Sequence, residues 1–189
     1  MLLFDLGGVL IANRTFEVLG EWFPEFSDTH IRKRWLESDA VRAFELGRIN
    51  RVAFSKRFIA EWHLHLTNDD FLHEFAAWPT GFFPGAEAAL SQWRGRYQVC
   101  CLSNANEIHW ARFNGFAPYF DRAFSSHLLG MIKPDRDVFE HVIGELGAAP
   151  SEIVFFDDSL PNIETARLLG MQAHHVEGFA AVVDLMGKS

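Results

Sequence analysis

The chain has 189 residues, of which 49% are apolar, and its 17 basic and 25 acidic residues give a formal charge of -8. This length suits one domain or a core domain with a small insert, and the apolar content is enough to bury a full core. The acidic balance argues against a nucleic-acid partner and against binding to an anionic membrane surface.

Short apolar runs that end in polar residues recur along the chain, with helical patterns between them. Strands that alternate with helices predict an α/β fold, in which a Rossmann-like parallel sheet has right-handed crossovers and helices on both faces. We expect strands at residues 1–4, 97–102, 122–125, 153–156 and 172–176, and helices at residues 86–93, 107–113, 135–146 and 162–169.

Residues 14–80 do not follow this alternation. They are rich in Phe and Trp at helical spacings, and Asn50 and Thr67 are expected to begin helices as N-caps. We therefore predict a small all-helical cap domain at 14–80, inserted after the first strand, and a core domain formed by 1–13 and 81–189. Residues 79–85 are expected to be a linker that returns the chain to the core.

The two cysteines, Cys100 and Cys101, are adjacent within an apolar run, which predicts two free thiols on a buried strand in a reducing compartment. No apolar run approaches the roughly 20 residues that a membrane-spanning helix needs. The first residues also lack the basic and apolar pattern of a secretory signal. The expected location is the cytoplasm.

Polar residues gather where the apolar runs end: Asp5, then Ser103 and Asn104, then Asp157 and Asp158. In an open parallel sheet, the carboxyl ends of the strands face the crevice that binds ligands. A single Asp at such a place says little, but several polar strand ends together with a lysine form a candidate site.

Four short motifs give these positions a likeness to a known family. They resemble, in the correct order, the four motifs of the haloacid dehalogenase-like superfamily, and they span most of the chain. The resemblance is greatest to bacterial alpha-D-glucose-1-phosphate phosphatases and to the phosphatase domain of soluble epoxide hydrolases. The motifs are Phe4-Asp5-Leu6-Gly7-Gly8-Val9, Leu102-Ser103-Asn104, Gly130-Met131-Ile132-Lys133-Pro134, and the run from Phe155 to Asn162.

The resemblance implies a role for each of these residues. Asp5 would attack phosphorus and form an aspartyl-phosphate, so that one difficult step becomes two easier ones. Lys133 would neutralise the charge that develops on the phosphoryl oxygens. Ser103, with Asn104 and the backbone N–H groups that follow, would bind the phosphoryl group. Mg²⁺ would be held by Asp5, Asp158 and the carbonyl of Gly7, with Asp157 beside it or as an alternative ligand, and Asn162 would orient the acidic loop.

Gly7 departs from the family pattern. Most phosphatases of this superfamily have a second Asp at this position, which protonates the leaving oxygen and later activates water. General acid–base catalysis of this kind is typically worth about 10² to 10⁴ in rate. Three alternatives follow: another group supplies the proton, the substrate has a leaving group that needs little protonation, such as an anomeric hydroxyl, or the protein binds phosphorylated ligands and turns them over poorly.

The sequence therefore predicts a magnesium-dependent hydrolase, most simply a phosphatase of small metabolites such as sugar phosphates of the glucose 1-phosphate kind. The alternatives are a haloacid dehalogenase and a non-catalytic protein that binds phosphorylated metabolites. A monomer or homodimer is expected. Polar residues of the insert that could contact a substrate include Arg14, Arg42, Glu45 and Arg48, but the sequence does not show which of them point inward.

Overall fold

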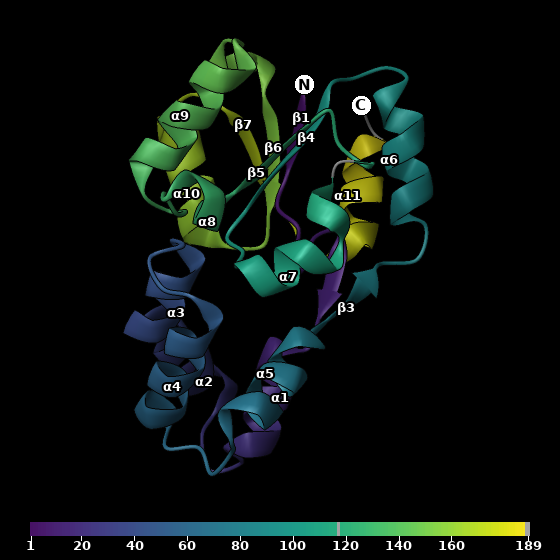
Figure 1. The fold of residues 1–189 in the computed structure, drawn as a ribbon. Coiled ribbons are helices and arrows are strands. Elements are labelled where there is room, and N and C mark those ends of the chain that lie inside the picture. The colour runs from purple at the N-terminus through teal and green to yellow at the C-terminus, as the bar shows by residue number, and fades with distance from the viewer. Residues whose placement is uncertain (117, 188–189) are drawn as a thin grey trace.

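The computed structural model describes residues 1–116 and 118–187, and its centre is a five-stranded parallel sheet (Figure 1). The strand order is β5-β4-β1-β6-β7, so that β1, the first strand of the chain, lies in the middle. The predicted α/β fold class is confirmed. The strands are β1 (Leu2–Phe4), β4 (Val99–Ser103), β5 (Arg122–Ser125), β6 (Val154–Asp157) and β7 (Gln172–His175).

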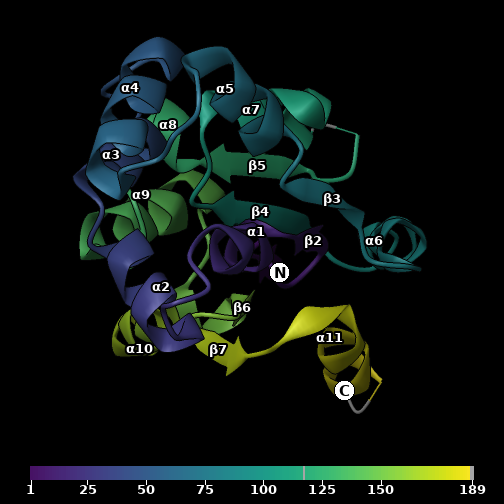
Figure 2. The same cartoon turned by 90° about the horizontal axis from the view of Figure 1, so that it is seen from below.

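Helices cover both faces of this sheet (Figure 2). Because successive side chains of a strand point to opposite faces, Phe4 of β1 packs into one core cluster and Leu3 into the other. On one face lie α6 (Ala86–Arg94), α7 (Glu107–Arg112) and α11 (Gly178–Met186). On the other face lie α9 (Arg136–Leu146) and α10 (Leu160–Leu168), and the short α8 (Ser126–Leu129) follows β5.

Two further strands connect the sheet to a group of helices. β2 (Ile11–Asn13) and β3 (Pro79–Phe82) pair in an antiparallel manner and carry the chain out of the core and back. Part of the expected return linker is therefore a strand. Between these strands are five helices, here called the helical segment: α1 (Thr15–Trp22), α2 (Asp28–Leu36), α3 (Asp39–Glu45), α4 (Arg51–Trp62) and α5 (Asn68–Ala76).

The helical segment has a core of its own that consists largely of aromatic rings. Phe54 is fully buried, and its ring centroid lies 4.2 Å from that of Phe44 and 4.9 Å from that of Phe75. The expected N-caps are present: Asn50 accepts a hydrogen bond from the N–H of Ala53, and Thr67 accepts one from Asp70. The aromatic spacing in this part of the sequence thus reflects packing of helices against each other.

Most predicted strands and helices of the core are present, with ends that differ by one or two residues. Helices α8 and α11, the pair β2–β3 and short 3-10 turns at Asn114–Phe116 and Pro150–Glu152 were not predicted. Cys100 and Cys101 are free and buried on β4, as expected. Among the described residues, no helix is both long enough and apolar enough to span a membrane.

Candidate functional site

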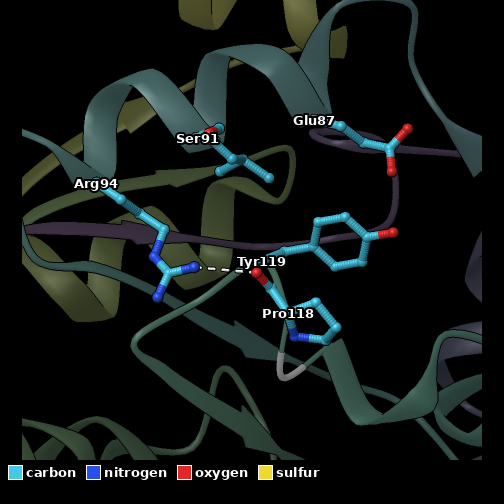
Figure 3. A pocket seen from close by; sticks show the side chains of 6 residues that line it. Glu87, Ser91, Arg94, Pro118 and Tyr119 are labelled. Atoms are coloured by element: carbon cyan, nitrogen blue, oxygen red, sulfur yellow. Dashed lines mark hydrogen bonds between the residues drawn. The ribbon is translucent and has the colours of Figure 1, made fainter.

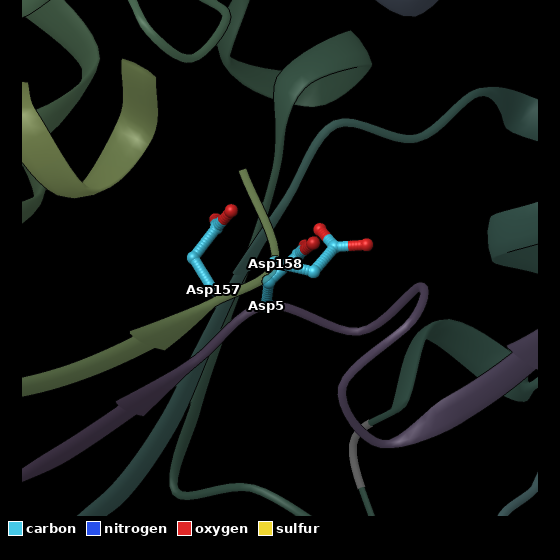
Figure 4. Close-up of side chains that lie close together, drawn as sticks. All are labelled: Asp5, Asp157 and Asp158. Carbon is cyan, nitrogen blue, oxygen red and sulfur yellow. The ribbon is translucent and has the colours of Figure 1, made fainter. Parts of the chain in front are cut away.

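Three carboxylates meet at the carboxyl edge of the sheet (Figure 4). Asp5 directly follows β1, Asp157 ends β6, and Asp158 comes next. Because β1 and β6 are paired neighbours, the N–H of Asp5 donates to the carbonyl of Phe156 over 2.8 Å. Carboxylate oxygens of the three residues lie within 4.8 Å of one another. The predicted acidic cluster therefore exists as a compact group.

Lys133 enters this cluster from the loop between α8 and α9. Its side chain is 1% exposed, and its Nζ lies 3.0 Å from Oδ1 of Asp5 and 2.6 Å from Oδ2 of Asp157. These two carboxylates raise the pKa of Lys133 against the opposing effect of burial, so the ammonium stays charged. A buried cation thus joins Asp5 to Asp157.

The two neighbouring aspartates of the last motif differ in their surroundings. Asp157 is fully buried, and both of its oxygens accept a hydrogen bond from Nδ2 of Asn162, at 2.9 and 3.0 Å. Its Oδ1 also accepts one from the N–H of Ser159. Asp158 is exposed and lies over the backbone of Gly8. Asp157 is therefore engaged in contacts within the protein, whereas the carboxylate of Asp158 forms no ion pair among the described residues.

Asn104 fixes the backbone that carries Lys133. Its Nδ2 donates to the carbonyl of Lys133 over 2.9 Å, and its Oδ1 accepts from the N–H of Lys133 over 3.0 Å. Ser103, the last residue of β4, is buried next to it, and β4 neighbours β1 in the sheet. The side chain of Asn104 is therefore occupied in holding the lysine loop, which the sequence could not show.

The charges of the cluster raise the pKa values of its acids. Burial raises the pKa of Asp5 to about 7; Lys133 opposes this effect, and repulsion from Asp157 and Asp158 adds to it. Burial, with repulsion from Asp157, raises the pKa of Asp158 to about 6. Three carboxylates share one lysine, so the site carries an excess of negative charge that a bound cation would relieve.

The donors fit a hard divalent cation. Mg²⁺ prefers oxygen ligands and is commonly held by one or two carboxylates, with waters completing its shell. Asp5 and Asp158 offer such oxygens. Gly7, which lies in the loop between β1 and β2, offers a backbone carbonyl. Asp157, whose oxygens are already bonded, fits the role of support for Lys133 better than that of a direct ligand.

Gly7 and Gly8 are glycines under different constraints. A Cβ on Gly8 would lie 2.2 Å from Oδ2 of Asp158, and the φ of Gly8 is +75°, so no other residue fits there without rearrangement. Gly7 has no positive φ, and a Cβ on it would meet nothing closer than Nδ2 of Asn13, at 3.9 Å. The backbone thus requires glycine at position 8 and leaves room for a side chain at position 7.

The helical segment contacts the core at two places around the cluster. On one side, Nη2 of Arg42 on α3 lies 2.6 Å from Oδ2 of Asp135, two residues after Lys133. On the other side, the ring of His109 on α7 stacks on Phe75 of α5, with 4.3 Å between the ring centroids. Figure 1 shows the helical segment beyond the carboxyl ends of the strands, where the cluster lies.

Among the four polar residues of the helical segment that were considered as substrate contacts, Glu45 is the one influenced by the charges of the acidic cluster. Burial raises the pKa of Glu45 to about 7, and Asp5 raises it further, while Lys133 and Arg42 oppose this effect. Arg14 instead pairs with Glu17 on the surface, and Arg42 pairs with Asp135. The sequence named Glu45 as a candidate, but no local pattern marks it as inward-facing.

A cleft of about 60 Å³ adjoins the cluster on the side of β2 and β4. Polar groups of its wall come from Asn13, Ser103 and Asn104, and much of the remainder is aromatic. His109 also borders this cleft and was not predicted. The other lining residues are Leu6, Gly7, Ile11, Pro79, Ala105, Trp110, Phe113 and Phe116.

A second cavity, of about 130 Å³, lies beside α6 (Figure 3). Arg94 in its wall donates to the carbonyl of Pro118 and pairs with Asp121, whose Oδ2 accepts from the N–H of Val99 at the start of β4. This cavity is therefore near the amino ends of the strands, away from the acidic cluster. Arg94, the basic residue of its wall, is already paired with Asp121, which leaves the cluster as the candidate site.

Known proteins share this arrangement. The sequence profile of haloacid dehalogenase-like hydrolases matches residues 1–170. The D-ribitol-5-phosphate phosphatase of Bacteroides thetaiotaomicron is 27% identical, over 95% of this chain and 92% of that protein. Bifunctional epoxide hydrolase 2 of Rattus norvegicus is 42% identical over 47% of this chain, but the match spans 17% of that longer protein.

Solved structures agree with the sequence comparison. A haloacid dehalogenase-like enzyme from Bacteroides thetaiotaomicron, in complex with magnesium and inorganic phosphate, superposes with a TM-score of 0.75 at 25% identity, covering 93% of both chains. An L-2-haloacid dehalogenase superposes with a TM-score of 0.65 at 20% identity, over 93% of this chain and 83% of that one, a likeness of fold alone. This chain belongs to the haloacid dehalogenase-like hydrolase family.

Proposed function

We propose that the protein is a magnesium-dependent phosphatase that hydrolyses small phosphorylated metabolites, with sugar and sugar-alcohol phosphates as the preferred class. The observation that carries this proposal is the placement of Asp5: its carboxylate lies 3.0 Å from a buried lysine and within 4.8 Å of two further acids at a sheet edge. The similarity to a D-ribitol-5-phosphate phosphatase over nearly the whole chain favours the same class of substrate.

In this proposal, Asp5 is the nucleophile. One carboxylate oxygen attacks phosphorus while the other side of the group stays near Lys133, whose ammonium neutralises charge on the phosphoryl oxygens. The hydroxyl of Ser103 and the backbone N–H of Asn104 bind the same oxygens. Asn104 acts a second time through its side chain, which holds Lys133 in place.

Asp5, Asp158 and the carbonyl of Gly7 are the proposed magnesium ligands. Bound there, the cation would offset the repulsion between the carboxylates and the phosphate of the substrate. Asp157 and Asn162 support the site from behind: Asn162 donates to both oxygens of Asp157, and Asp157 in turn positions Lys133.

The helical segment, with flanking residues 14–80, is proposed to act as a cap domain over a core formed by 1–13 and 81–189. Its position beyond the strand ends and its contacts with α7 and with Asp135 support this role (Figure 1). A cap of this kind excludes water from the reaction and selects the substrate.

Asp5→Asn provides the test. The wild-type protein with Mg²⁺ should release phosphate from members of a panel that includes D-ribitol 5-phosphate, glucose 1-phosphate and glucose 6-phosphate. Asp5→Asn should abolish this release without lowering the melting temperature, since it removes one of the charges that repel each other. Asp69→Asn, an exposed change on α5, is the matched control and should leave the rate unchanged.

Two results would overturn the proposal. Phosphate release that persists in Asp5→Asn would exclude Asp5 as the nucleophile. Phosphorylated metabolites that raise the melting temperature with Mg²⁺ but release no phosphate from the wild-type protein would show a binding protein instead of an enzyme.

A further inference from the structure

Glu45 ends α3 at the boundary between the helical segment and the core. The residues on either side of it are fixed to that boundary. Three positions earlier, Arg42 lies on the same helix face and pairs with Asp135 of the core. Two positions later, Gly47 lies so close to the core that a Cβ on it would be 2.3 Å from the carbonyl oxygen of His127. Glu45 is therefore held at the boundary by contacts before and after it in the chain.

The core segments that Arg42 and Gly47 contact are those that carry the site. Asp135 follows Lys133 by two residues. His127 lies on the short helix α8, whose first residue, Ser126, hydrogen-bonds to the backbone of Ala105, directly after Asn104. The charges that act on Glu45 come from Asp5 and Lys133 of the core and from Arg42 of its own helix. The carboxylate of Glu45 therefore lies close enough to the cluster for the charges of Asp5 and Lys133 to act on it.

The carboxylate of Glu45 differs from the other acids at this boundary in its pairing. The other acids at the boundary are paired, Asp135 with Arg42 and Glu107 with Arg51. Among the described residues, no hydrogen bond or ion pair to the carboxylate of Glu45 is found, although the residue is partly buried. A partly buried acid that has no partner among the described residues is free to exchange a proton.

We propose that Glu45 is the general acid and base of the reaction, in place of the side chain that position 7 lacks. The inference rests on the proposed phosphatase function. In the first step, Asp5 forms a bond to phosphorus, the bond from phosphorus to the substrate oxygen breaks, and that oxygen takes the proton of Glu45. In the second step, Glu45 accepts a proton from a water whose oxygen attacks phosphorus. The bond to Asp5 then breaks, phosphate leaves, and Glu45 is protonated again.

The electrostatics of the boundary suit this role. A general acid must hold its proton near neutral pH and give it up in the reaction, and the raised pKa of Glu45, about 7, allows both. A cation on Asp5 would weaken the repulsion that contributes to this pKa. The phosphate of a bound substrate brings negative charge into the same space and acts in the opposite direction, so the acid stays protonated when it is needed.

Glu45→Gln tests the proposal through the leaving group of the substrate. With D-ribitol 5-phosphate, the leaving alkoxide needs a proton, and we expect kcat to fall by about 10² to 10⁴. With p-nitrophenyl phosphate, the leaving phenolate is stable without a proton, and kcat for release of the phenolate should change by less than about tenfold. Glu37→Gln, an exposed change directly after α2, is the control and should affect neither substrate.

Restoring an acid at position 7 gives a second, independent test. Because the backbone leaves room at Gly7, Glu45→Gln combined with Gly7→Asp should recover at least about tenfold of the lost rate with D-ribitol 5-phosphate. A structural role for Glu45 would give no such rescue. In the wild type, kcat should fall as the pH rises above about 7, because Glu45 loses its proton. This fall in kcat should be absent in Glu45→Gln.

A third readout needs neither metal nor turnover. In metal-free protein, the difference in melting temperature between Glu45→Gln and wild type should become more positive from pH 5 to pH 8, since only the wild type must ionise a buried carboxyl. The proposal is overturned if Glu45→Gln retains its rate with D-ribitol 5-phosphate, or if it loses rate equally with both substrates. Asp5→Asn separates the cases, because its full activity would instead reject the proposed function.

Discussion

The Nζ of Lys133 lies 2.6 Å from Oδ2 of Asp157, a pair in which both side chains are at most 1% exposed. Loss of Asp157 would leave Lys133 with Asp5 as its charged partner, at the longer distance of 3.0 Å, and breaking a buried ion pair typically costs about 3–5 kcal/mol. The adjacent Asp158 is exposed and has no such partner among the described residues. In the proposed function these two consecutive aspartates therefore have different roles: Asp157 holds Lys133, and Asp158 binds the metal.

Asp157→Asn should lower stability more than Asp158→Asn, whereas Asp158→Asn should weaken magnesium binding more than Asp157→Asn. Asp157→Asn should lower the free energy of unfolding by about 3 kcal/mol, because Lys133 loses the nearer of its two carboxylate partners. Asp158→Asn should leave stability in metal-free buffer unchanged or raised, since it removes repulsion within the cluster. For magnesium, Asp158→Asn should be the more damaging and weaken binding by at least about tenfold, or about 1.4 kcal/mol.

Urea unfolding and titration calorimetry measure these two effects separately. If Asp157→Asn abolishes magnesium binding while stability is retained, Asp157 is a direct ligand and the assignment of the two aspartates must be exchanged.

Gly7→Ala and Gly8→Ala form a matched pair that tests the backbone of the first motif. At Gly8 the positive φ and the 2.2 Å approach to Asp158 oppose any side chain, so Gly8→Ala should cost at least about 2 kcal/mol and weaken magnesium binding. At Gly7 the nearest atom lies at 3.9 Å, and Gly7→Ala should change the free energy of unfolding by less than about 1 kcal/mol. Equal losses from the two changes would show that position 7 is also confined.

Phe54→Ala tests whether the aromatic cluster holds the helical segment together. Phe54 is fully buried among Phe44, Phe58 and Phe75, and truncation of such a residue typically costs about 3–5 kcal/mol. Val52→Ala on the same helix, at a side chain that is 51% exposed, should cost less than about 0.5 kcal/mol. Chemical denaturation followed by tryptophan fluorescence distinguishes them, and similar losses would contradict the packing described.

The parts of the fold that are visible in the sequence are those with strong local patterns. The runs that form β1, β4 and β6 are short, apolar and followed by polar residues, so each strand can be predicted from its own residues alone. β3 was missed because Pro79-Thr-Gly-Phe82 has the composition of a loop, and its strand geometry depends on pairing with β2, far away in the sequence.

The site can likewise be divided into residues that a local motif predicts and contacts that depend on distant parts of the chain. Its members Asp5, Lys133 and Asp158 could be predicted because each lies in a short motif. What could not be predicted are contacts between distant parts of the chain, such as the hydrogen bonds of Asn104 with the backbone of Lys133 and the approach of Glu45 to the cluster. The direction in which a side chain of the helical segment points depends on how that segment docks, and no local pattern encodes the docking.

His109 should make stability fall in mild acid. Its Nε2 lies 2.8 Å from the carbonyl of Phe75, and its Nδ1 lies 3.2 Å from Nδ2 of Asn106, which suits a neutral ring that donates at Nε2 and accepts at Nδ1. Burial lowers the pKa of His109 to about 4 from the ordinary value of 6.5, the hydrogen bond with Phe75 opposes this effect, and Arg112 adds to it.

The sign follows from which state binds more protons. Between pH 6.5 and 4 the unfolded chain protonates this histidine and the folded chain does not, so stability is full above pH 6.5 and is lost as the pH falls. At pH 5 the loss should be about 2 kcal/mol. In His109→Gln this part of the pH dependence should be absent, while the raised pKa values of Asp5 and Glu45 affect both proteins alike and cancel in the comparison. Urea unfolding of both proteins at pH 7.5 and 5 measures the difference, and a difference in stability that does not change with pH would show that His109 is protonated in the folded protein.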